Sequence, residues 1–118
     1  MSTSQRSESP VFACDLAVFD LAELKEHRDN VRSLAAALKD ARLETPTRLV
    51  VELPDEAGVV RQALDFAMRE RRCCSFFQFR LEIGELMGTH RLVVDVPEGG
   101  EGILSQAREE FAKGSLPT

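Results

Sequence analysis

The sequence predicts an α+β fold, a two-layer sandwich in which helices cover one face of a small mixed sheet. Two long segments place apolar residues at helical spacing, and two later segments alternate apolar and polar residues on either side of a glycine-containing turn. Strand and helix patterns follow one another in the order β-α-β-α-β-β-α. The chain has 118 residues, of which 43% are hydrophobic and 30% charged, as expected for one domain with a single core.

The chain divides into a tail, one domain and a second short tail. Residues 1–10 are rich in Ser and include charged residues and a Pro, so they bury too little apolar surface to offset the entropy of ordering and predict a disordered tail. We expect a single α+β domain over residues 11–114, followed by a tail at 115–118. The apolar stretch Val11–Leu16 predicts the first strand.

Three helices are predicted. Asp20, three residues before Glu23, forms a capping box at the start of a helix over Leu21–Arg42, and Thr45-Pro46 ends this helix because the residue before a proline avoids helical geometry. A second helix is expected from Glu56 to Cys74. Its predicted inward stripe consists of Val60, Ala63, Leu64, Ala67 and Met68. A short last helix contains Ile103, Leu104, Ala107 and Phe111.

The remaining elements are strands. Arg48–Leu53 is short and β-branched, and Pro54-Asp55 ends it as a strand running into a turn. Residues 77–83 and 91–96 alternate apolar and polar side chains around a turn that contains Gly84 and Gly88, which predicts an antiparallel hairpin with one apolar face.

Charge and composition exclude several classes of protein. Twenty acidic residues against fifteen basic ones give a net charge of -5, which disfavours direct binding to nucleic acid or to an anionic membrane surface. The sequence contains no apolar run of roughly 18 to 20 residues and no apolar leader, so we expect no membrane span and a cytoplasmic location. Phosphate-loop and dinucleotide motifs are also missing, so no nucleotide cofactor is expected.

The three cysteines are the residues most indicative of chemistry. Cys14, Cys73 and Cys74 are odd in number and two are adjacent, which predicts thiols rather than a disulfide framework. On a helical wheel Cys74 and Arg71 fall on the apolar side, so Arg71 is expected to be buried and paired, and Glu70 falls at its edge. Neighbouring helical side chains point about 100° apart, so a further ligand, Cys14, is needed for one metal site.

Thiolates at these positions favour a soft or borderline metal ion. Zinc, copper(I), mercury and arsenite bind sulfur well, whereas magnesium and calcium prefer oxygen. The predicted ligands are Cys14, Cys73 and Cys74, with Glu70 and Arg71 contacting and orienting them. The two histidines, His27 and His90, are expected to be solvated.

The cysteine segment resembles a known pattern. Glu70-Arg71-Arg72-Cys73-Cys74-Ser75-Phe76, with Phe79 downstream and Cys14-Asp15-Leu16 upstream, resembles small, mostly uncharacterised bacterial proteins with C-x-L and E-R-x-C-C-x-F-x-x-F motifs. These are similar in setting to heavy-metal and mercury-resistance accessory proteins, and similar segments are attached to MerR-type regulators. The family commonly has Pro after the second cysteine, where this chain has Ser75.

Three functions are consistent with these observations. The first is a metal-binding or metal-response accessory protein, which would not be an enzyme. The second is a thiol-based redox enzyme or sensor with Cys73 or Cys74 as nucleophile and Cys14 as resolving thiol. The third is an interaction module whose cysteines only pack, forming a homodimer through a sheet face or edge.

Overall fold

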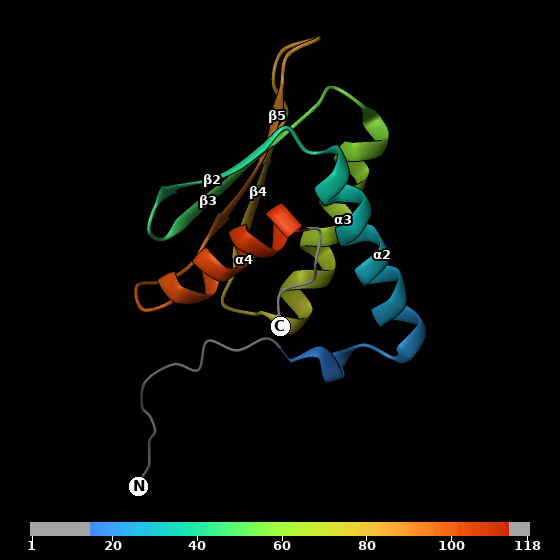
Figure 1. Ribbon diagram of the computed structural model, residues 1–118, viewed down its shortest axis with the longest axis vertical. Coiled ribbons are helices and arrows are strands. Elements are labelled where there is room, and N and C mark those ends of the chain that lie inside the picture. The colour runs from blue at the N-terminus through green and yellow to red at the C-terminus, as the bar shows by residue number, and fades with distance from the viewer. Residues whose placement is uncertain (1–14, 114–118) are drawn as a thin grey trace, which may run out of the picture.

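The computed structural model describes residues 15–113, which form three α-helices and a four-stranded sheet (Figure 1). In chain order the elements are a 3-10 turn η1 (Leu16–Val18), α2 (Leu21–Ala37), β2 (Asp40–Thr45), β3 (Arg48–Leu53), α3 (Ala57–Cys73), β4 (Gln78–Glu82), β5 (His90–Asp95) and α4 (Glu101–Lys113). The strand order is β2-β3-β5-β4. The predicted α+β class is confirmed, but each of these strand pairings is antiparallel, so the expectation of a mixed sheet is wrong for the described residues.

The N-terminal helix is shorter than predicted. Its capping box is present, since Glu23 N donates to Asp20 Oδ1 and the Glu23 carboxylate accepts from Asp20 N. The helix ends at Ala37, and Asp40–Thr45, part of which was assigned to it, forms β2. Ala41 and Leu43 alternate with charged residues, and in β2 this alternation turns them toward the core. The Thr45-Pro46 signal therefore marks a hairpin turn between β2 and β3 rather than the end of a helix.

The predicted first strand is the other difference in element order. Residues 11–14 lie outside the described part of the chain, and Leu16, the last residue of that prediction, begins η1 instead. The helix predicted at Glu56–Cys74 is confirmed as α3, the hairpin is confirmed as β4 and β5, and the last helix is confirmed as α4.

The core lies between the sheet and the helices. One face of the sheet supplies Ala41, Leu43, Leu49, Val51, Leu53, Phe79, Leu81, Leu92, Val94 and Val96. Helix α2 packs against α3, and α4 contacts α2, β2 and β3. Figure 1 shows the helices gathered on one side of the strands. On β4, Phe79 and Leu81 are only partly buried and line an open groove beside α3, so the helices cover the apolar face of the hairpin incompletely.

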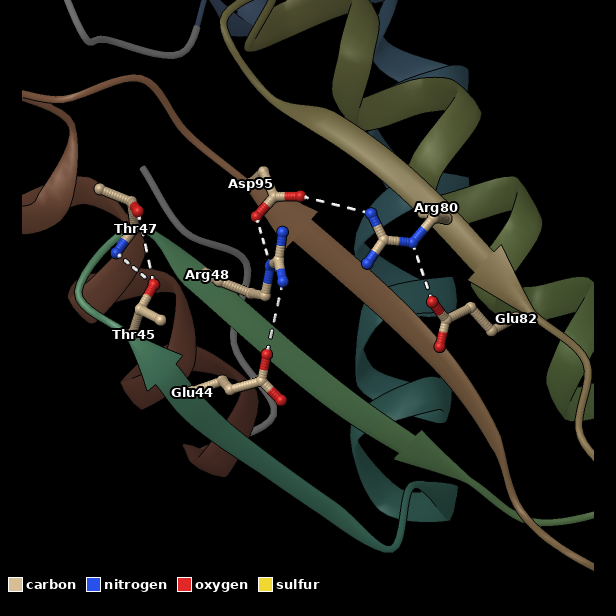
Figure 2. A network of polar contacts seen from close by, with 7 residues as sticks. All are labelled: Glu44, Thr45, Thr47, Arg48, Arg80, Glu82 and Asp95. Atoms are coloured by element: carbon tan, nitrogen blue, oxygen red, sulfur yellow. Dashed lines mark hydrogen bonds and ion pairs between the residues drawn. The ribbon is translucent and has the colours of Figure 1, made fainter.

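The opposite face of the sheet is charged. Arg48 Nε donates to Asp95 Oδ1 over 2.8 Å and Arg80 Nε to Glu82 Oε2 over 2.8 Å, forming part of the network in Figure 2. Val50 and Val93, which are paired across β3 and β5, are nevertheless only 2% exposed. They lie in register with Arg42 and Arg80, whose aliphatic stems can cover them. This face offers paired charges rather than an apolar surface to a second copy of the chain.

No helix within residues 15–113 is long and apolar enough to cross a membrane.

Candidate functional site

The side chains of α3 that face the core differ from the predicted stripe. The buried residues of this helix are Val59, Ala63, Phe66, Ala67, Glu70 and Cys73. Leu64 and Met68, which were predicted to face inward, are 47% and 51% exposed. The true stripe is therefore rotated by about one residue, or 100°, from the predicted one. Glu70 is turned into the core by this rotation.

Arg71 is turned out of the core by the same rotation. It is exposed and lines a groove between α3 and β4, so the prediction that it is buried and paired is wrong. The energetic reason is that one buried charge on this stripe is already Glu70, and Arg71 retains its solvation at the surface.

The adjacent cysteines are brought together. Cys73 is the last residue of α3, whereas Cys74 is its C-cap with φ -121° and ψ 72°, outside helical geometry. Both are buried, at 5% and 0% exposure, and their sulfur atoms lie 3.5 Å apart. The 100° divergence expected for two helical neighbours is therefore wrong here, because the chain leaves the helix between them.

Glu70 completes a compact set of donor atoms with the two cysteines. Its side chain is 1% exposed, and its Oε1 lies 3.4 Å from Cys74 Sγ. One carboxylate oxygen and the two sulfur atoms all lie within 4.8 Å of one another. Glu70 was predicted only to orient the sulfur atoms, whereas one of its own oxygens lies as close to Cys74 Sγ as the sulfur atoms lie to each other.

His27 of α2 holds the other oxygen of that carboxylate. Its Nε2 lies 2.8 Å from Glu70 Oε2, and the histidine is fully buried. An ionised carboxylate only accepts, so Nε2 carries the shared proton when Glu70 is charged. Within the described residues His27 Nδ1 has no hydrogen-bond partner. The prediction that His27 is solvated is wrong, and this pair satisfies a charge that would otherwise be isolated in the core.

The sequence contained a signal for both of these residues. In α2, His27 stands midway between Leu24 and Val31, one turn from each, where the inward stripe requires a side chain. In α3, Glu70 follows Phe66 by four residues in the same way. A polar residue on each of two inward stripes indicates a buried pair, but only the packing of α2 against α3 makes them partners.

The first described residues are fixed against the cysteine end of α3. Asp15 N donates to Cys73 O over 2.8 Å. Arg72 donates to Val18 O over 3.2 Å, pairs with Glu23 at 3.0 Å, and lies 5.0 Å from the centre of the Phe19 ring. Cys14, the third predicted ligand, lies outside the described residues.

The two cysteines differ in chemical state. Cys73 is a free thiol, and Cys74 is disulfide-bonded, so the prediction of thiols is wrong for Cys74. Burial, and to a smaller extent the nearby Glu70 carboxylate, together raise the pKa of the Cys73 thiol to about 12. The Arg72 guanidinium opposes this rise but contributes less. Cys73 is therefore protonated at neutral pH in spite of the neighbouring arginine.

The second histidine is also buried and hydrogen-bonded. His90, predicted to be solvated, is 5% exposed; its Nδ1 accepts from Gly84 N and its Nε2 lies 2.8 Å from Asp55 Oδ1. Asp55 also accepts from Met87 N, so the pair fastens the β4–β5 turn to the loop before α3. With both ring nitrogens engaged, this pair has a structural role.

Comparison of this chain with models of protein families, with curated proteins and with solved structures finds no match.

Proposed function

We propose that this protein binds a soft or borderline metal ion, of the zinc, copper(I), mercury or arsenite class, through cysteine thiolates at the C-terminal end of α3. The observation that carries the proposal is the buried set of Glu70, Cys73 and Cys74 donor atoms within 4.8 Å. We further propose that the resemblance of Glu70–Phe76 to segments of heavy-metal accessory proteins reflects this role.

The donor spacing supports one shared ion. Two Zn–S bonds of about 2.3 Å at a tetrahedral angle place their sulfur atoms roughly 3.8 Å apart. The Cys73 and Cys74 sulfurs are 3.5 Å apart, and Glu70 Oε1 is 3.4 Å from Cys74 Sγ. Small shifts of buried side chains would bring all three atoms to bonding distance of one ion.

The electrostatics of the site also favour a cation. Burial and Glu70 raise the pKa of Cys73, so a thiolate is disfavoured there unless a cation is bound. A bound divalent ion supplies the missing positive charge and stabilises the deprotonated sulfur. A nucleophilic thiol needs a lowered pKa instead, which makes metal binding the better of the two explanations.

Cys14 is the third thiolate of the proposal. Asp15, its neighbour in the chain, hydrogen-bonds to Cys73 O, and consecutive Cα atoms are only about 3.8 Å apart. Cys74 is disulfide-bonded, so it becomes a ligand only after reduction. We therefore propose that the reduced protein is the metal-binding form.

The test is a titration of the fully reduced protein with zinc and with mercury. Zinc affinity is measured by competition with a chromophoric chelator, and mercury binding by the ultraviolet thiolate-to-metal absorbance. Wild-type protein should bind one ion tightly, and Cys73→Ser, Cys74→Ser and Cys14→Ser should each weaken binding at least about tenfold. Ser75→Ala is the matched control because it changes the neighbouring side chain without removing sulfur. Reduced wild-type protein that binds neither ion would overturn the proposal.

A second candidate function is thiol–disulfide exchange. The free Cys73 thiol lies 3.5 Å from the disulfide-bonded Cys74 sulfur, which is the arrangement of an attacking thiol beside its target. In such an exchange the Cys73 thiolate forms the new sulfur–sulfur bond and the former partner of Cys74 leaves as a thiolate. Stoichiometric reduction of a model disulfide by the pre-reduced, metal-free protein, in which two protein thiols are oxidised to a disulfide, would favour this function if Cys73→Ser abolishes it.

A further inference from the structure

The carboxylate of Glu70 is held between two different kinds of group. Its Oε2 lies 2.8 Å from His27 Nε2, while its Oε1 lies 3.4 Å from Cys74 Sγ. One oxygen is thus committed to the histidine of α2, and the other is directed to the sulfur atoms at the end of α3.

The His27 ring itself has little freedom to move. It is fully buried, with its ring centroid 5.3 Å from that of Phe19 and 6.0 Å from that of Phe66. Phe19 is in turn covered by the Arg72 guanidinium. The donor to Glu70 is therefore held by packing against two aromatic rings, which helps to define the direction of the carboxylate as well as its position.

We infer that His27 is a positioning residue of the proposed metal site: it holds Glu70 with one oxygen toward the sulfur atoms, and thereby makes the site favour zinc over softer ions. The inference rests on the proposed function, since it concerns which ion that same site selects. No part of it depends on a change in the charge of either residue.

The preference follows from the ligand chemistry. Zinc accepts carboxylate oxygen at about 2.0–2.2 Å as well as thiolate sulfur, so a fixed oxygen donor adds to its affinity. Softer ions such as copper(I) and mercury gain their affinity from sulfur and gain little from a carboxylate. A site of sulfur atoms alone would favour the softer ions, and an oriented Glu70 shifts the balance toward zinc.

The test compares zinc and mercury affinities of reduced variants, with glutathione present as a competing thiol for mercury. Glu70→Gln and His27→Phe should each weaken zinc binding by about 10- to 100-fold while mercury affinity changes less than about threefold. His27→Gln should retain most of the zinc affinity, because its amide can donate to Glu70 from nearly the position of Nε2. His90→Phe is the matched control, since it removes the hydrogen bond that the other buried histidine makes to the Asp55 carboxylate.

The outcomes separate this inference from the proposed function. Wild-type protein that binds zinc and mercury, with a zinc-to-mercury affinity ratio that Glu70→Gln leaves unchanged, overturns the inference alone. A zinc-to-mercury affinity ratio that falls equally in His27→Phe and in His90→Phe would mean that His27 contributes only general stability, and would also overturn the inference. Urea unfolding shows whether His27→Phe folds. If it does not, the zinc-to-mercury affinity ratios of Glu70→Gln and His27→Gln test the inference instead. Wild-type protein that binds neither ion overturns the proposed function itself.

Discussion

At the scale of single residues, the most consequential feature is that Glu70 is buried beside His27. An ionised side chain in a core is tolerated only when it is paired, and this pair lies at 1% and 0% exposure. The partners come from different helices, 43 residues apart in the chain. The pair therefore ties α2 to α3 at the point where the cysteines lie.

Removing the Glu70 carboxylate should destabilise the fold. Glu70→Ala leaves His27 buried without its partner, so we expect the free energy of unfolding to fall by about 3 kcal/mol or more. Glu70→Gln keeps an acceptor for His27 Nε2 and should cost less. Urea unfolding of both variants checks this, with Glu56→Gln, an exposed carboxylate at the start of the same helix, as the control. A Glu70→Ala variant as stable as this control would contradict the pairing.

The buried thiol of Cys73 predicts a specific dependence of stability on pH. Burial raises its pKa from 9.0 to about 12, so at alkaline pH the folded protein keeps a proton that the unfolded chain has lost. The stability that the wild type gains from this thiol is fully present below pH 9 and is lost as the pH rises toward 12. The free energy of unfolding of reduced wild-type protein and of Cys73→Ala is measured in urea at pH 7.5 and at pH 10.5. The difference between the two proteins should be smaller at pH 10.5. If the stability difference is the same at both pH values, the pKa of Cys73 is not raised in the folded protein.

At the scale of elements, the turns and caps fix where helices and strands begin and end. Asp20 caps α2 through Glu23 N, and the β4–β5 turn is fastened by His90, Asp55 and the backbone of Gly84 and Met87. Helix α3 lacks such a side-chain cap at Glu56. The first turn of α3 is therefore a place where a substitution can raise the stability of the fold.

Two glycine substitutions should have opposite effects. Gly58 lies in the first turn of α3, where an added Cβ meets nothing within 4 Å, so Gly58→Ala should raise the free energy of unfolding by about 0.5–1 kcal/mol. At Gly84 the same Cβ would stand 2.2 Å from Thr89 O, a backbone atom, so Gly84→Ala should lower it by more than about 1 kcal/mol. Denaturant unfolding measures both. Equal effects of the two changes would mean that the turn adjusts freely.

At the scale of the whole molecule, the proposed site joins three parts of the chain. α3 supplies Glu70 and the cysteines, α2 supplies His27, and the segment from Asp15 to Phe19 is anchored to the end of α3 by Arg72. A ligand bound there would be linked to the stability of the entire domain, because a folded site binds it and an unfolded chain does not.

Zinc should therefore stabilise the reduced protein against heat. At a free zinc concentration 100 times the dissociation constant the gain is about 2.7 kcal/mol, which raises Tm by several degrees for a domain of this size. Cys73→Ser should gain less, because a site weakened tenfold gains only about 1.4 kcal/mol at the same zinc concentration. Calorimetry of the two reduced proteins at matched zinc concentrations makes the comparison, and a wild-type Tm that zinc does not raise would contradict the proposal.

The sequence by itself determined the fold class, the extent of α3, the β4–β5 hairpin, the last helix and the segment in which the chemistry lies. These features follow from local periodicity, capping and turn residues, which act over a few positions. It did not reveal β2, because Asp40–Thr45 becomes a strand only by pairing with β3. The alternation of Ala41 and Leu43 is too short to compete locally with a preceding helical pattern.

The tertiary structure alone decided the composition of the site. The wheel for α3 was in error by one residue, since Leu64 and Met68 are as apolar as the residues that are truly buried. What sets the rotation is the partner that each side chain meets: Glu70 turns inward because His27 is there to bind it, and Arg71 turns outward. The sulfur atoms of Cys73 and Cys74 meet because the helix ends between them. Such matches between distant elements depend on packing, which no local pattern encodes.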